Sequence, residues 1–102
     1  MTSTLTESAR GEECTLMIAP YCNNNPETVV LCHLPSQGSG MALKSPDHWA
    51  AYGCSACHDI LDQRNPQAIR AIGREEIMRC MFRGLYRTQQ RLIEKGLMRV
   101  AK

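Results

Sequence analysis

Six cysteines in a chain of 102 residues constrain the fold of this protein more than any other feature. Cys54 and Cys57 are separated by two residues and precede an apolar, helix-like stretch. A tight Cys-x-x-Cys turn at a helix start directs both sulfurs to one side, so the pair is half of a tetrahedral zinc site. Cys14 and Cys22 bracket a short apolar segment and are the predicted second half, although each could instead be a small buried side chain.

Length and composition favour one small domain in a reducing compartment. A chain of 102 residues forms a single domain with a marginal core, which a bound metal would stabilise. No apolar run approaches the roughly 20 residues of a membrane span, and the N-terminus lacks the basic and apolar regions of a signal peptide. We therefore expect a cytoplasmic protein with no membrane partner, whose cysteines bind metal or remain free.

Charge is distributed unevenly along the chain. Residues 1–63 hold two basic and seven acidic residues, a net −5, whereas residues 64–102 hold ten basic and three acidic residues, a net +7. A basic C-terminal part is typical of proteins that bind a polyanion, although a solvated helix face can also be basic. Basic side chains every four residues predict a ridge about 24 Å long that could follow a phosphate backbone. They are Arg79, Arg83, Arg87, Arg91 and Lys95.

Turn residues divide the chain into predicted elements. Residues 1–10 are polar and expected to be poorly ordered, and residues 11–102 form the single domain. Strands are predicted over 28–34 and 49–53, and a first helix begins with Ser55 as its N-cap. Asn65 and Pro66 start a second helix, which ends at Gly73, and a third runs over 74–95 despite Gly84. The fold class is therefore α+β, with the hairpin and first helix in 28–64 and the C-terminal helices in 65–97.

Two histidines flank this predicted hairpin. His33 lies near the end of the first strand, and His58 lies in the first turn of the following helix. A strand-loop-strand-helix unit of this size can bring both imidazoles to one cleft, where one would deprotonate water and the other would hold a divalent ion. A lone strand histidine is more often simply packed. Cys54-x-x-Cys57-His58 is also the attachment signature of c-type haem, an alternative that requires export.

Several of these residues match a known family. They are Cys14 and Cys22, Asn25-Pro26-Glu27-Thr28, His33, Cys54-Ser55-Ala56-Cys57-His58-Asp59 and Arg87-Thr88-Gln89. From about Ala9 to its end, the chain resembles the YbcO family of small phage and prophage proteins, nucleases of the HNH or His-Me finger superfamily. The resemblance implies a small ββα-metal core on a treble-clef-like zinc site formed by the four paired cysteines, followed by C-terminal helices.

The resemblance also implies roles for individual residues. His33 matches the general base that activates the attacking water, and His58 matches a ligand of a catalytic Mg²⁺ or Mn²⁺ ion. Asp47 and His48 are the nearest candidates for the second ligand, and Asp47 is favoured because a carboxylate suits a hard cation. Cys32 stands where HNH enzymes often have Asp or His, and it either is buried or approaches this site. Cys80 is expected in the core of the last helix.

The sequence thus predicts a metal-dependent endonuclease that hydrolyses phosphodiester bonds in DNA. Branched DNA, single-stranded DNA and RNA remain open as substrates, and no oligomeric state is predicted. A second hypothesis is a catalytically inactive zinc-finger module that binds nucleic acid. A third is a protein-interaction finger of a phage or prophage complex, which would neither bind nor cleave DNA.

Overall fold

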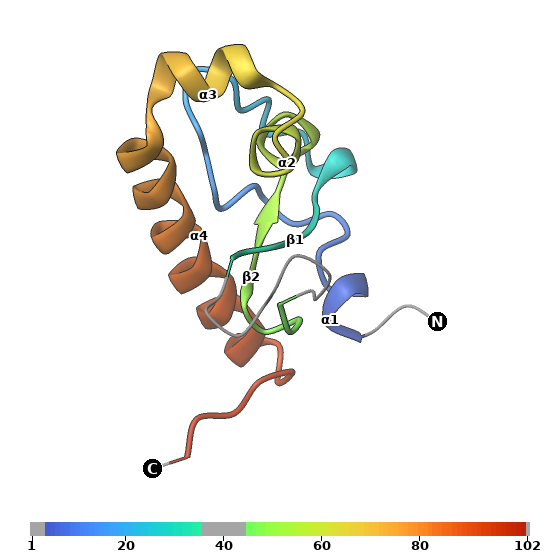
Figure 1. Ribbon diagram of the computed structural model, residues 1–102. Helices are drawn as coiled ribbons and strands as arrows, with labels where there is room; N and C mark the ends of the chain where they lie inside the picture. The colour runs from blue at the N-terminus through green and yellow to red at the C-terminus, as the bar shows by residue number, and fades with distance from the viewer. Residues whose placement is uncertain (1–3, 36–44, 102) are drawn as a thin grey trace.

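The computed structural model describes residues 4–35 and 45–101. In chain order the elements are helix α1 (Thr4–Glu7), the 3-10 turn η1 (Pro26–Thr28), strands β1 (Val30–His33) and β2 (Ala50–Gly53), and helices α2 (Ser55–Leu61), α3 (Pro66–Ile72) and α4 (Arg74–Glu94). The strands pair antiparallel, from Val30 opposite Gly53 to His33 opposite Ala50. The fold is α+β: helix α2 follows the hairpin directly, and α4 runs alongside it (Figure 1). None of the described helices is long and apolar enough to cross a membrane.

Local sequence signals set most element boundaries. Asn65 caps α3 by accepting a hydrogen bond from the backbone N–H of Ala68 (3.1 Å), as the Asn-Pro pair predicted. Asn25 caps η1 in the same way, so the first strand is shorter than the predicted range 28–34. The predicted N-cap of α2 was wrong, because Cys54 and not Ser55 occupies that position.

The N-terminal segment also differs from its prediction. Residues Thr4–Glu7 form a short helix where little order was expected, and Ala9 is buried. The Ser8 hydroxyl lies 2.8 Å from the hydroxyl of Tyr52, and Lys95 Nζ donates to the Ser8 carbonyl at 2.7 Å. Because both partners are distant in sequence, the local composition of this segment did not reveal its attachment.

Gly84 allows α4 to approach the hairpin closely. A Cβ at this position would lie 2.9 Å from Leu16 Cδ2 and 3.1 Å from Ala51 Cβ. Leu16 has little room to move, because its other methyl group fills the space beside Gly53, where a Cβ would come within 2.7 Å of it. The helix therefore remains continuous through a residue of low helix propensity, since the absence of a side chain is what its packing requires.

We predict that Gly84→Ala lowers the free energy of unfolding by about 1–3 kcal/mol, because overpacking outweighs the roughly 1 kcal/mol gained in helix propensity. Urea denaturation of the metal-loaded protein measures the change. Gln90→Ala, on the exposed side of the same helix, is the matched control and should shift stability by less than about 0.5 kcal/mol. A Gly84→Ala protein as stable as the parent would show that Leu16 repacks without cost.

Candidate metal centre and active site

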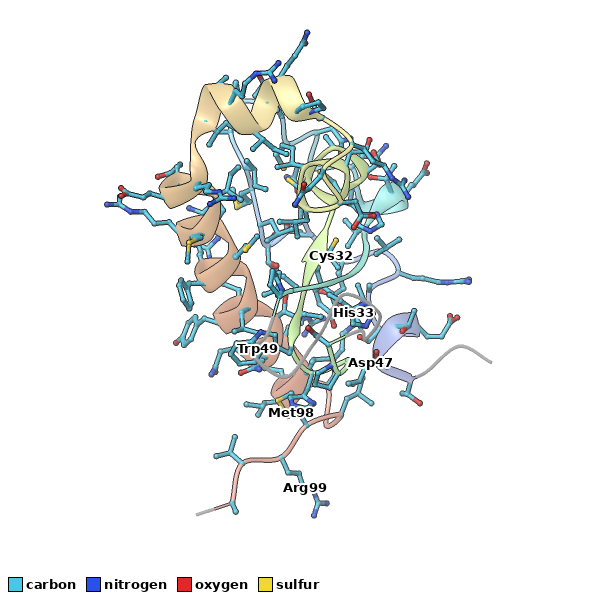
Figure 2. The ribbon with its side chains drawn as sticks, viewed as in Figure 1. Cys32, His33, Asp47, Trp49, Met98 and Arg99 are labelled. Atoms are coloured by element: carbon cyan, nitrogen blue, oxygen red, sulfur yellow. The ribbon has the colours of Figure 1, made fainter. Side chains whose placement is uncertain are left out.

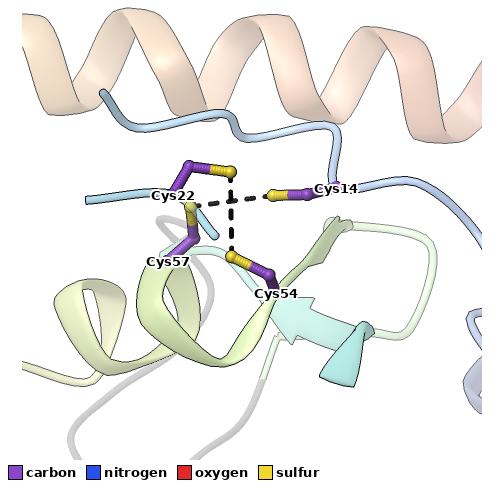
Figure 3. Close-up of side chains that lie close together, drawn as sticks. All are labelled: Cys14, Cys22, Cys54 and Cys57. Carbon is purple, nitrogen blue, oxygen red and sulfur yellow. Dashed lines mark hydrogen bonds between the residues drawn. The ribbon is translucent and has the colours of Figure 1, made fainter. Parts of the chain in front are cut away.

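Four cysteine sulfurs meet between the N-terminal loop and the start of α2 (Figure 3). The Sγ atoms of Cys14, Cys22, Cys54 and Cys57 all lie within 4.8 Å of one another. The Sγ distances are 3.6 Å for Cys14 and Cys57 and 3.8 Å for Cys22 and Cys54. Four sulfurs bound tetrahedrally to zinc at about 2.3 Å lie about 3.8 Å apart, so this spacing fits a metal ion. The prediction that the two cysteine pairs converge is confirmed.

The backbone of the loop between Cys14 and Cys22 also faces the sulfurs. The Met17 N–H donates to Cys14 Sγ and the Ile18 N–H donates to Cys57 Sγ, each at 3.4 Å. Met17 adopts a left-handed φ of 48°, which turns the chain between the two cysteines. Backbone donors of this kind stabilise negative charge on sulfur and orient the ligands of a metal. The loop therefore closes on the same centre as the Cys-x-x-Cys turn.

The crowding of the thiols makes their acidities differ. The hydrogen bond with Cys57 lowers the pKa of Cys14 to about 4, whereas burial raises the pKa of Cys22 to about 11. The same hydrogen bond raises the pKa of Cys57. Without a cation, one thiolate is therefore favoured at the expense of its neighbours. A divalent ion removes this conflict, because it binds deprotonated thiolates, and the donor set is compatible with structural zinc.

This arrangement does not support a haem attachment site. Cys54 and Cys57 are 0% exposed, and their sulfurs face those of Cys22 and Cys14 rather than an open surface. All six cysteines are free of disulfides. Cys80 is buried on α4, as predicted.

His33 pairs with Asp47 at the loop end of the hairpin. His33 Nε2 lies 2.7 Å from Asp47 Oδ1, and the two side chains are 32% and 35% exposed. Figure 2 shows both residues beside Trp49 at this end. A carboxylate on one ring nitrogen fixes the tautomer, so that the other nitrogen carries a lone pair. The pair can therefore accept a proton from a solvent molecule or ligand through Nδ1.

His58 pairs with a different carboxylate. Its Nε2 lies 3.2 Å from Asp62 Oδ2, one helical turn later. Asp47, the predicted partner of His58 on a catalytic ion, contacts His33 instead. Sequence analysis overlooked Asp62, although its i,i+4 spacing from His58 was a usable signal.

The two histidine pairs remain separate within the described chain. Across residues 4–35 and 45–101, the four-cysteine group is the one place where three or more Cys, His, Asp or Glu side chains converge closely enough to hold an ion. Cys32, beside His33, is buried with its Sγ 3.7 Å from the Val30 carbonyl oxygen. Burial raises the pKa of this thiol, which therefore keeps its proton.

Two arginines of the predicted basic ridge contact the loop that carries Cys14. The Arg83 guanidinium donates to the carbonyl oxygens of Leu16 (2.7 Å) and Met17 (3.1 Å). Arg87 Nη1 lies 3.4 Å from the sulfur of Met17. Arg83 therefore ties α4 to the metal-binding loop, a role that its periodic spacing did not predict.

Two side chains at the C-terminal end of the ridge share one carboxylate, and Arg91 also lies 3.7 Å from Glu94. Glu12 lies 3.0 Å from Arg91 Nε and 2.6 Å from Lys95 Nζ. Arg79, by contrast, has a side chain that is 82% exposed and lies 4.0 Å from Glu76. Four of the five predicted phosphate-binding side chains thus have intramolecular partners from the N-terminal segment: Arg83, Arg87, Arg91 and Lys95.

Fold and site together define a small α+β domain with a four-cysteine centre that fits a metal ion and a histidine–carboxylate pair at its hairpin end. The family model described as "Putative nuclease YbcO" matches residues 3–97, and the chain belongs to this YbcO family. Relatives bearing the same description in Escherichia coli (strain K12) and Enterobacteria phage 82 are each 38% identical over 96 residues, covering 93% of this chain and 96% of theirs.

A solved structure agrees with this assignment. It is described as that of "a putative bacteriophage protein from Escherichia coli" and shares 35% sequence identity with this chain. The superposition has a TM-score of 0.72 and covers 89% of this chain and 98% of the other. The similarity therefore extends over nearly the whole fold.

We predict that the protein binds one metal ion per chain at the four-cysteine centre and loses its fold when a strong chelator removes the ion, because a structural ion contributes folding free energy directly. Elemental analysis and circular dichroism test both points. Cys57→Ala should lose the ion, whereas Cys80→Ala, buried but outside the centre, should retain it. Full metal content in the Cys57→Ala protein would contradict the four-sulfur site.

We also predict that Glu12→Gln destabilises the fold by about 1 kcal/mol at pH 7, because two cations lose a common partner. Burial alone would raise the pKa of Glu12, but the hydrogen bonds from Arg91 and Lys95 lower it below its usual value of 4.5. The stabilisation is therefore complete above about pH 4.5 and disappears as the pH falls through the lowered pKa.

Urea denaturation of the parent and Glu12→Gln proteins at neutral and acidic pH measures this difference. The difference in free energy of unfolding between the two proteins should disappear at acidic pH. Glu13→Gln, at the exposed neighbouring position, is the matched control and should leave stability unchanged. If the difference in free energy of unfolding stayed the same at low pH, the ionised carboxylate of Glu12 would not be its cause.

Proposed function

We propose that this protein is a metal-dependent endonuclease of the HNH type that hydrolyses phosphodiester bonds in DNA. The family description and the names of both curated relatives support a nuclease at the family level, and hence a nucleic acid substrate. The basic C-terminal part, with a net charge of +7 over residues 64–102, supports a polyanionic ligand. The hairpin followed directly by α2 has the element order expected of a ββα core.

The observation that carries the proposal is the contact of His33 with Asp47 at 2.7 Å. In our mechanism Asp47 orients His33, whose Nδ1 takes the proton of the water that attacks the phosphorus atom. In this proposal Asp47 positions the general base His33 and is not a ligand of the catalytic ion. The partial exposure of both side chains leaves the imidazole accessible to a nucleic acid backbone.

His58 and Asp62 are the residues that we assign to a catalytic divalent ion. The carboxylate suits Mg²⁺ or Mn²⁺, which typically complete their coordination with water and substrate phosphate oxygens, and the imidazole would add one nitrogen ligand. Such an ion, when bound, would stabilise negative charge on the leaving 3′ oxygen. The contact of 3.2 Å between His58 on α2 and Asp62, the residue that caps the end of this helix, already holds both groups together.

We assign zinc to the four-cysteine centre. Four thiolates at tetrahedral spacing select zinc or iron–sulfur chemistry over hard cations. With every coordination position filled by sulfur, the ion has no site for water or substrate and acts on structure alone.

The second candidate is an inactive zinc-finger module that binds nucleic acid. It is favoured by Cys32, a buried thiol with a raised pKa at a position where HNH enzymes often carry a hard metal ligand. It is also favoured by the separate partners of His33 and His58.

Plasmid cleavage with Mg²⁺ or Mn²⁺ distinguishes the two candidates. We predict cleavage that His33→Gln reduces by about 100-fold or more, the usual contribution of a general base, and that Asp47→Asn reduces to a smaller extent. His48→Gln, at an exposed position next to Asp47, is the matched control and should retain parental activity. Equal cleavage by the His33→Gln and parent proteins would refute His33 as the base. DNA binding without any cleavage would favour the inactive module.

A further inference from the structure

An apolar hollow opens between the loop end of the hairpin and α4, and the proposed chemistry does not use it. Leu34, Pro35 and Trp49 line the hairpin side, and Met78, Met81 and Phe82 line the α4 side. The volume is about 330 Å³, at the lower end of the range of roughly 300–1,000 Å³ for small-ligand sites. A hollow of this size and composition suits one flat ring system better than an extended polar ligand.

Trp49 is held in position without any ligand. Its Nε1 donates to the Pro35 carbonyl oxygen at 2.8 Å, and its own carbonyl accepts from the Leu34 N–H at 3.0 Å. The single polar group of the indole is therefore satisfied, and a ligand would meet a preorganised aromatic surface. Across the hollow, Phe82 is 64% exposed and Met78 is 52% exposed, so apolar area remains open to a partner.

We propose that this hollow binds an unpaired base of a nucleic acid by stacking against Trp49 and Phe82. The lining side chains are apolar or aromatic, so they can contact the face of any base but cannot read its hydrogen-bonding edge. Arg79 lies three residues before Phe82 on α4, and its 82% exposed side chain offers a cation to a neighbouring phosphate. Stacking surface beside positive charge is the combination by which proteins hold single strands.

Trp49, which lines the hollow, lies at the same end of the hairpin as the His33–Asp47 pair (Figure 2). Side chains of consecutive residues in an extended chain point to opposite faces. The side chains of His33 and Leu34 therefore lie on opposite faces of the hairpin at this end. A strand with one base in the hollow would pass its backbone around the end of β1 towards His33. The inference rests on the proposed function for its ligand, and it narrows the substrate class to DNA with unpaired bases, as in single strands or branch points.

Trp49 is the single tryptophan of the sequence, so its fluorescence reports on the hollow directly. The metal-loaded protein, without added Mg²⁺ or Mn²⁺, is titrated with a short single-stranded DNA, with an abasic strand of equal length and with a fully paired duplex of the same sequence. We expect the single strand to bind and quench Trp49, and the abasic strand and the duplex to leave its emission unchanged.

Phe82→Ala should weaken binding of the single strand about tenfold, within the range for removal of one stacking partner. Tyr86→Ala is the matched control, because Tyr86 is 67% exposed one turn further along α4 and does not line the hollow. The Tyr86→Ala protein should keep parental affinity and quenching.

Equal affinity for the single strand and the abasic strand, with unchanged Trp49 emission, would overturn the proposal. So would a parent protein that is dimeric by analytical ultracentrifugation and becomes monomeric on Phe82→Ala, because a second copy would then cover the hollow. The titration involves no cleavage, so the proposed base-binding hollow and the proposed nuclease activity are tested independently. Cleavage of plasmid or of the single strand that depends on His33, without base-dependent quenching, would refute the hollow alone. Quenching without cleavage of either DNA in the presence of Mg²⁺ or Mn²⁺ would refute the catalytic assignment alone.

Discussion

The convergence of four sulfurs at one point is the constraint on which the rest of this structure depends. Cys14 and Cys22 come from the N-terminal loop, while Cys54 stands at the junction of β2 and α2. A bound ion therefore joins the loop, the hairpin and the helix in a chain too short to orient them by a large core. The positions of His33 and His58 relative to each other follow from this junction.

Helix α4 supports the same centre from the other side. Its close approach at Gly84 and the hydrogen bonds from Arg83 hold the loop that includes Leu16, between the first two cysteines. Glu12, just before that loop, pairs with Arg91 and Lys95. Much of the basic charge that resembles a phosphate-binding ridge in the sequence therefore stabilises the metal-binding loop. Arg79, whose side chain is 82% exposed, lies three residues before Phe82 of the apolar hollow.

A two-stranded hairpin is narrow enough for its end to present two different surfaces. His33 and Asp47 form a polar pair on one side, and Trp49 with α4 forms an apolar surface near it. General-base chemistry requires a solvated imidazole with a fixed tautomer, whereas base stacking requires a dry, preorganised aromatic face. The alternation of side chains along the strand keeps these incompatible environments apart.

The sequence by itself determined the features that depend on short-range spacing: the Cys54–Cys57 pair, the Asn65 cap of α3, and the hairpin followed by helices. It also predicted that Cys14 and Cys22 meet the same centre, because the Cys54–Cys57 pair supplies only half of a tetrahedral site. Only the tertiary structure decided that Asp47 contacts His33 rather than His58. The His58–Asp62 pair has i,i+4 spacing and was readable from the sequence, whereas a pair joined across a loop depends on chain geometry that residue spacing does not encode.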